Sequence, residues 1–171
     1  MPYFVFAEFA NPQVAKFLTD LRNALQSENN PSPVHVTLRG PYDTPPPLDQ
    51  LKTYSERLIG YGVRIGNYGY FSTKKGYAAF LLAECTVFRE LWDKPDYKTP
   101  PELIKPHITM FESKKRSAAL EVRAFLRKED IYIHTYNISL SVYESRSVQM
   151  DMFGGPIVLP TMLPKNQDVW R

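Results

Sequence analysis

The sequence predicts an α+β fold in which antiparallel sheets carry helices on their outer faces. Strand patterns dominate the chain, and they are connected by hairpins or by short helices. The two halves also run in a similar order, since each has a His-x-Thr strand followed by a helix and then by further strands. The chain has 171 residues, 43% of them hydrophobic, which is enough to bury a substantial core. We expect a single two-lobed domain over 1–171, with lobes near 1–85 and 86–153 and an extended tail at 154–171.

The first half is expected to run strand, helix, strand, helix and hairpin. The N-terminal helix has the clearest start, because Asn11 stands at the N-cap position and Pro12 in the first turn. A glycine in the short link TKKG suits the hairpin turn. In order, the expected elements are a strand at 3–9, a helix at 11–26, a strand within 32–41, a helix at 48–59 and paired strands at 63–72 and 76–84.

The second half begins with a short helix and a proline-rich connection that leads to another motif strand. Regular alternation of apolar and polar residues then predicts one long strand near its end. In order, the expected elements are a helix at 86–92, the connection at 93–106, a strand within 105–113, a helix at 116–127, a long strand at 131–145 and a further strand at 148–153.

Composition and charge narrow the class of protein only a little. The net charge is +3, from 21 basic and 18 acidic residues, which suits an anionic ligand without demonstrating one. Cys85 is the only cysteine, so an internal disulfide and a cysteine metal cluster are excluded, and a buried side chain is a better interpretation than a catalytic thiol. The N-terminus lacks a basic signal-peptide region and no stretch has the length of a membrane span, so we expect a cytoplasmic protein.

Two short segments carry the functional signal. In SPVHVTLRGP, residues 32–41, His35 and Thr37 alternate with apolar residues, and KPHITMFES, residues 105–113, repeats the arrangement with His107 and Thr109. Side chains two residues apart on a strand share a face. Two of three histidines would have a threonine at this spacing in only about 1% of random arrangements. One such strand is ordinary for a half-buried sheet, but two require an explanation.

A pair of imidazoles facing one small volume can serve as general base and general acid, since histidine titrates near neutral pH. Two threonine hydroxyls on the same strands can donate hydrogen bonds to two non-bridging oxygens of a phosphate. This set fits a phosphodiester better than a carbonyl. No HExxH, clustered Cys/His or P-loop pattern is present, so we expect neither a metal nor a cofactor. A Ser-His-Asp arrangement stays open, although GxSxG is absent.

The tetrapeptides HVTL at 35–38 and HITM at 107–110 resemble the paired motifs of the 2H phosphoesterase superfamily. The chain looks like the branch that contains the bacterial 2'-5' RNA ligases of the LigT type and the cyclic phosphodiesterases. The resemblance covers about 1–150, and its specific part is the two tetrapeptides and their order. It implies a duplicated two-lobed fold with a central cleft and metal-independent cleavage of RNA-type phosphodiesters.

The resemblance also implies roles for four side chains. His35 and His107 would be the base and the acid, in an order that the sequence does not assign, and Thr37 and Thr109 would hold the phosphate.

Three further residues are candidates for substrate binding. Arg39 follows Thr37 by two residues and could contact phosphate, although a solvated strand-end arginine explains it equally well. Phe111 stands in the matching place after Thr109, where it could stack on a base or simply contact the core. Tyr42 could line the mouth of the site, but packing in a turn is the better interpretation.

The leading hypothesis is a phosphodiesterase that acts on a 2',3'-cyclic phosphate, a 2',5'-linked nucleotide or a cyclic nucleotide. The alternative is an RNA- or nucleotide-binding module with the same cleft and little turnover. The expected partner is an RNA end, an oligonucleotide or a cyclic nucleotide, with no membrane, and we expect a monomer. Base, linkage and length of the substrate are not predicted by the sequence.

Overall fold

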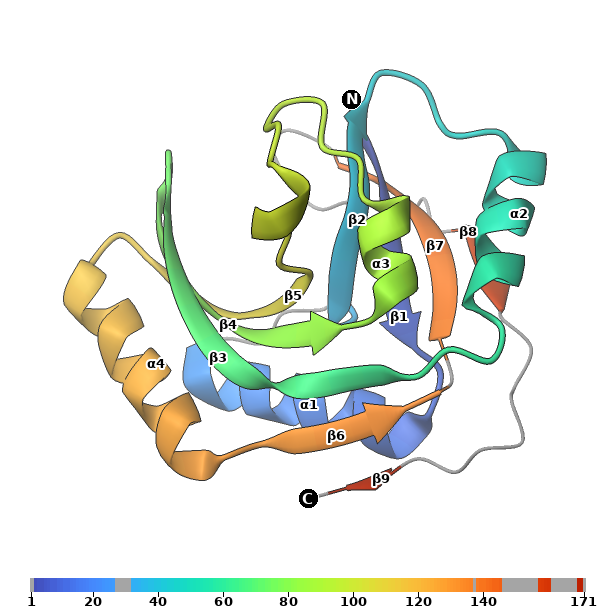
Figure 1. Ribbon diagram of the computed structural model, residues 1–171. Coiled ribbons are helices and arrows are strands. Elements are labelled where there is room, and N and C mark those ends of the chain that lie inside the picture. The colour runs from blue at the N-terminus through green and yellow to red at the C-terminus, as the bar shows by residue number, and fades with distance from the viewer. Residues whose placement is uncertain (1, 27–31, 137, 146–156, 161–168, 171) are drawn as a thin grey trace.

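The computed structural model describes residues 2–26, 32–136, 138–145, 157–160 and 169–170, which form two antiparallel sheets and several helices (Figure 1). This confirms the predicted α+β class. In chain order the strands are β1 (Tyr3–Phe9), β2 (His35–Tyr42), β3 (Val63–Thr73), β4 (Gly76–Glu84), β5 (His107–Ser113), β6 (Tyr132–Thr135), β7 (Ile138–Glu144), β8 (Ile157–Pro160) and β9 (Val169–Trp170). The helices are α1 (Pro12–Gln26), α2 (Leu48–Leu58), α3 (Thr86–Leu91), the short 3-10 helix η1 (Pro101–Leu103) and α4 (Arg116–Glu129).

The smaller sheet has the strand order β2-β1-β7-β8, and the larger sheet has the order β5-β4-β3-β6-β9. The larger sheet is curled into a half-barrel, because β3 and β4 bend strongly along their length (Figure 1). An irregularity in β3 accompanies this bend. Asn67 has a positive φ of 50°, and the register with β4 shifts between Gly66 and Tyr68. An extra residue of this kind bends a strand and increases its twist.

The stretch at 131–145, predicted as one long strand, is two strands that belong to different sheets. β6 pairs with β3 in the larger sheet, whereas β7 pairs with β1 in the smaller sheet. The prediction is wrong because both parts alternate in the same way, so the pattern does not mark the point where the chain crosses between sheets. Each sheet therefore takes strands from both halves of the sequence, and the sheets do not follow the predicted lobes 1–85 and 86–153.

The predicted tail at 154–171 contributes β8 to the smaller sheet and β9 to the larger one. The strand predicted at 148–153 lies outside the described residues.

The helices cover the sheets and close a hydrophobic core that draws residues from both of them. Helix α1 packs on β1 of the smaller sheet and on β5 of the larger sheet, with Val14 and Leu18 fully buried one turn apart. Its predicted N-cap is confirmed, because Asn11 Oδ1 accepts hydrogen bonds from the backbone N–H groups of Gln13 and Val14 at 2.9 and 3.1 Å. Helix α4 packs on β3, β4 and β5, and α2 packs on β7 and β8. Of the helices in the described ranges, none is long and apolar enough to cross a membrane.

This arrangement brings the two motif strands together. In the described part of the chain, β2 is the outer strand of the smaller sheet and β5 is the outer strand of the larger sheet. The two outer strands contact each other. Segments that lie some seventy residues apart in the sequence are thus neighbours in space.

Candidate active site

The two motif strands alternate as their sequences predict. Val36 and Leu38 of β2, like Ile108 and Met110 of β5, are buried in the core. The histidines and threonines between them are half-buried, on the other face of each strand. The strands therefore present four polar side chains while they anchor themselves through apolar ones.

The two histidines make the same hydrogen bond. Nδ1 of His35 lies 2.8 Å from the carbonyl oxygen of Pro33, and Nδ1 of His107 lies 2.8 Å from the carbonyl oxygen of Lys105. A carbonyl oxygen can only accept, so Nδ1 carries the proton in each neutral ring. The bond fixes the tautomer and the orientation of both rings and leaves Nε2 as the nitrogen that can exchange a proton with a substrate.

An aromatic ring supports the first histidine. Phe6 of β1 stands opposite Thr37 in the sheet and stacks on the imidazole of His35, with ring centroids 3.7 Å apart and planes 13° apart. Tyr143 of β7 stacks on the other side of this cluster, 5.2 Å from the Phe6 ring. The contact restricts the imidazole and removes water from one of its faces.

The second histidine has matching support from the larger sheet. Phe80 of β4 stands opposite Thr109, and its ring centroid lies 4.8 Å from that of His107. Phe71 of β3 contacts the same imidazole edge-on at 5.1 Å. Gly69 makes room for this arrangement, because a Cβ there would lie 2.2 Å from the Phe80 ring. Phe6, Phe71 and Phe80 were all missed in the sequence, where they look like ordinary strand residues.

Each motif strand carries a bulge directly after its threonine. Opposite β2, the adjacent residues Val5 and Phe6 pair with Arg39 and Thr37, so Leu38 is the extra residue. Adjacent residues on a regular strand point to opposite faces. Arg39 therefore does not share the face of Thr37, and the prediction that it does is wrong.

The partners of Arg39 agree with this register. Its guanidinium donates to the carbonyl oxygen of Leu91 at 2.8 Å and to Asp93 Oδ2 at 3.3 Å. It also lies over the ring of Tyr54 in α2, at 4.8 Å. Tyr42 belongs to the same cluster, since its hydroxyl donates to Asp93 Oδ2. Burial and the bond to Asp93 raise the pKa of Tyr42, and both residues hold the end of α3 against the smaller sheet.

Phe111 is displaced in the same way. Thr109 stands opposite Phe80, whereas Phe111 stands opposite the neighbouring Ala79, so Met110 is the extra residue. The bulge interrupts the regular register between Thr109 and Phe111.

Lys94 is the most informative residue that the sequence did not reveal. The segment after α3 runs alongside β2, because the backbone N–H of Asp93 donates to Leu38 at 3.0 Å and the N–H of Gly40 donates to Asp93 at 2.9 Å. Asp93 turns toward Arg39, and Lys94 follows it with its ammonium 5.3 Å from the centre of the Trp92 ring. A proline-rich connection gives no periodic signal, so nothing local marked this lysine.

Burial and nearby cations lower the pKa of both imidazoles. Burial lowers the pKa of His35 to about 4, against a smaller opposing effect of the bond to Pro33, and the charges of Arg22, Lys94 and His107 lower it further. Burial also lowers the pKa of His107, with a further contribution from Lys94. The charge of Lys94 thus acts on both rings, and the charge of His107 acts on the His35 ring. Arg22 reaches the site from α1, where it donates to the carbonyl oxygen of Ser32 at 2.5 Å.

A carboxyl group also lies on the face of the first motif strand. Glu8 of β1 stands opposite His35 and accepts a hydrogen bond of 2.6 Å from the hydroxyl of Ser141. Burial raises the pKa of Glu8, against the smaller effect of the serine. The equivalent position opposite His107 is occupied by Leu82, so the two sides of the site differ in polarity.

The arrangement combines two imidazoles of fixed tautomer, two threonines beside them, the buried guanidinium of Arg22 and the half-buried ammonium of Lys94. Such a set can move protons to and from a ligand while it stabilises negative charge. Within the described residues there is no group of three or more His, Cys, Asp or Glu side chains that could hold a metal ion. Cys85 is buried, and burial raises the pKa of its thiol, in agreement with the structural role expected from the sequence. No protein-family model and no curated protein matches this chain.

Proposed function

We propose that this chain is a metal-independent phosphodiesterase of the 2H type, which acts on RNA-type phosphodiesters such as a 2',3'-cyclic phosphate or a 2',5'-linked or cyclic nucleotide. One observation carries the proposal. The imidazoles of His35 and His107 make the same 2.8 Å bond from Nδ1 to the carbonyl two residues before them, on two outer strands that touch. A single ordered histidine is common in proteins, but two with the same tautomer and the same support suit a base and acid pair.

The duplicated 2H fold is part of this proposal. Each motif strand is an outer strand, each is followed by a helix, and each has its bulge directly after the threonine. The neighbouring strand in each sheet supplies a phenylalanine that stands opposite the motif threonine and contacts the motif histidine. These parallels support an origin of the two sites from one repeated unit.

The difference in environment supports one assignment of the two roles. The pKa of His35, at about 4, makes it the neutral partner at neutral pH, so it is the general base. His107 is the general acid, since Lys94 is the only one of the charges lowering the pKa of His35 that also lowers the pKa of His107. A bound phosphodiester brings a negative charge that raises the pKa of both rings, so His107 becomes protonated when the substrate binds.

The reaction then follows from the two Nε2 atoms. A water or ribose oxygen attacks phosphorus while His35 Nε2 takes its proton, and a new P–O bond forms. The bond from phosphorus to the leaving ribose oxygen breaks as His107 Nε2 gives that oxygen its proton. Thr37 and Thr109 donate hydrogen bonds to the non-bridging oxygens, and Arg22 and Lys94 stabilise the charge that builds on them.

Purified protein should therefore turn over at least one member of a panel of 2',3'-cyclic mononucleotides and 2',5'-linked dinucleotides, with EDTA present throughout. Chromatography of the products would identify which ribose oxygen leaves. Binding of these ligands with no turnover of any of them would contradict the proposal and would favour the nucleotide-binding module instead.

A further inference from the structure

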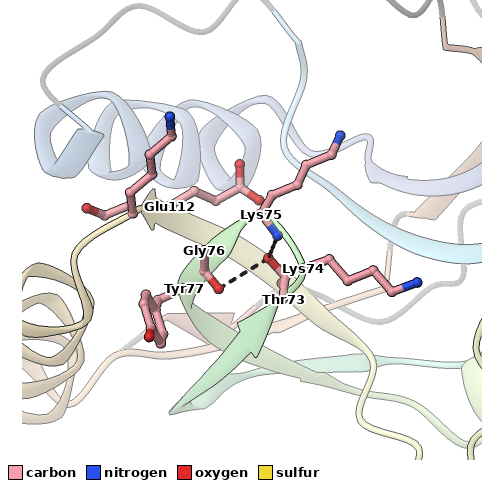
Figure 2. A pocket seen from close by; sticks show the side chains of 8 residues that line it. Thr73, Lys74, Lys75, Gly76, Tyr77 and Glu112 are labelled. Atoms are coloured by element: carbon pink, nitrogen blue, oxygen red, sulfur yellow. Dashed lines mark hydrogen bonds between the residues drawn. The ribbon is translucent and has the colours of Figure 1, made fainter.

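A cavity of about 560 Å³ lies where the turn between β3 and β4 meets the end of β5 (Figure 2). The turn residues Thr73, Lys74 and Lys75 form one wall, and Ser113 and Lys114 form another. This cavity is separate from the histidines and has no part in the proposed proton transfers.

The backbone of the cavity is held in place. The Thr73 hydroxyl lies 3.2 Å from the carbonyl oxygen of Gly76 and accepts a hydrogen bond of 3.1 Å from the N–H of Lys75 (Figure 2). Gly76 has a φ of +150°, and a Cβ there would lie 2.5 Å from the carbonyl oxygen of Ser113. Only glycine allows the turn to approach the end of β5 this closely, so the two walls are fixed relative to each other.

The charge of the cavity is mainly positive. Lys74, Lys75 and Lys114 are all exposed, and Lys74 and Lys75 extend away from the turn in Figure 2. Among the ion pairs formed by the described residues, none involves these three lysines. Glu112 is the one carboxylate among the residues that line the cavity. Three ammonium groups against one carboxylate make a site for an anion with several charges.

An aromatic ring connects the cavity to the candidate active site. Phe71 of β3 contacts the imidazole of His107 at 5.1 Å. Thr73 lies two residues further along the same strand, and the pairing with β4 is regular over this interval. The two side chains therefore share a face, about 7 Å apart. The order along this face is imidazole, half-buried phenylalanine and then Thr73, which the lysines of the turn follow in the chain.

We propose that this cavity binds backbone phosphates of a single-stranded RNA whose cleaved end lies at the two histidines. The proposal rests on the proposed function and names its substrate class as an oligonucleotide that extends several nucleotides beyond the scissile phosphate. Basic grooves interleaved with aromatic rings are the general means of holding single strands, because phosphates pair with the cations while bases stack on the rings. Phe71 offers a ring that contacts His107 and lies on the same strand as Thr73 of the cavity.

Binding can be tested without any turnover. A fluorescent single-stranded RNA of about ten nucleotides with a 3'-phosphate would be titrated with the parent protein, with a K74A/K75A/K114A variant and with K52A, which removes an exposed lysine of α2 as a control. The triple variant should bind at least tenfold more weakly, and K52A should bind like the parent. The slope of log affinity against log salt should fall in magnitude by about 2, or about 0.7 for each lost phosphate contact.

Equal affinity and equal salt slope for the parent and the triple variant would overturn the proposal, whether or not the protein turns over any substrate. Displacement of the RNA by a polyglutamate peptide at equal charge concentration would also overturn the proposal, because the cavity would then be a site for acidic peptides.

Turnover supplies the second readout. With an oligonucleotide that ends in a 2',3'-cyclic phosphate, the triple variant should have a KM raised at least tenfold, whereas its kcat/KM for a cyclic mononucleotide should equal that of the parent. Equal losses on both substrates would contradict a site for the extended strand. Absence of turnover by the parent protein on both substrates would count against the proposed function alone, since the binding result stands apart from it.

Discussion

Replacing His35 with asparagine should remove much of the pH dependence of stability in weak acid. The asparagine amide can still donate to the carbonyl of Pro33, but it does not titrate. In the folded parent, burial holds the pKa of His35 at about 4, whereas an unfolded chain has a histidine pKa of about 6.5. As the pH falls below 6.5, the unfolded state therefore binds the proton first, and the free energy of unfolding decreases until the pH approaches 4.

The size of the effect follows from the shift. One pKa unit corresponds to about 1.4 kcal/mol, so the parent should lose about 2 kcal/mol more than the variant between pH 6.5 and pH 5. Urea unfolding at pH 7 and pH 5, followed by tyrosine fluorescence and circular dichroism, would measure both proteins. Carboxyl groups titrate alike in the two, so the difference isolates His35. An equal decrease of the free energy of unfolding in parent and variant would refute the lowered pKa of His35, on which the assignment of His35 as the base depends.

Four further outcomes are expected. The pH profile of kcat/KM should be bell-shaped with its optimum below 6.5, because activity falls when His35 is protonated at low pH and when His107 loses its proton at higher pH; an optimum above 8 would contradict the assignment. Gly69→Ala should lower the free energy of unfolding by about 1 to 3 kcal/mol and should lower turnover, since the new Cβ displaces the Phe80 ring from the imidazole. A melting temperature and a turnover rate equal to those of the parent would show that the ring has room to move. Arg39→Ala should lower the free energy of unfolding by about 1 to 3 kcal/mol, because it removes the bonds to Leu91 and Asp93. An unchanged stability together with a raised KM would instead indicate that Arg39 binds the substrate. EDTA should leave the rate unchanged, and a loss that zinc or manganese restores would require a metal-dependent mechanism.

Local pattern was enough to predict most of the described elements and the two motif strands. Strand alternation is visible wherever one face is buried, and the Asn11 cap and the hairpin glycine have direct local chemistry. That the strands of His35 and His107 are neighbours was also predictable, because repetition of a rare spacing carries information that no single residue carries.

What the sequence did not reveal depends on contacts between distant segments. A bulge after each motif threonine is set by the partner strand, so the sequence offered no reason to place Arg39 on the far side. The chain leaves the larger sheet after Thr135 and is in the smaller sheet from Ile138, inside one continuous alternation of the sequence. The position of Lys94 follows from the backbone hydrogen bonds of the preceding Asp93 with Leu38 and Gly40, and the local sequence of a proline-rich connection does not predict these bonds.

The kcat of His35→Ala and of His107→Ala on a 2',3'-cyclic nucleotide, measured beside the parent protein, tests the acid and base pair most directly. Each variant should turn over about 10² to 10⁴ times more slowly with its circular dichroism spectrum unchanged, because a positioned acid or base contributes about that factor. Thr37→Ala and Thr109→Ala, measured in the same assay, should cost less, about 10 to 10³, since each removes one hydrogen bond to the developing charge. A folded His35→Ala, His107→Ala double variant that kept the parental kcat would contradict the account.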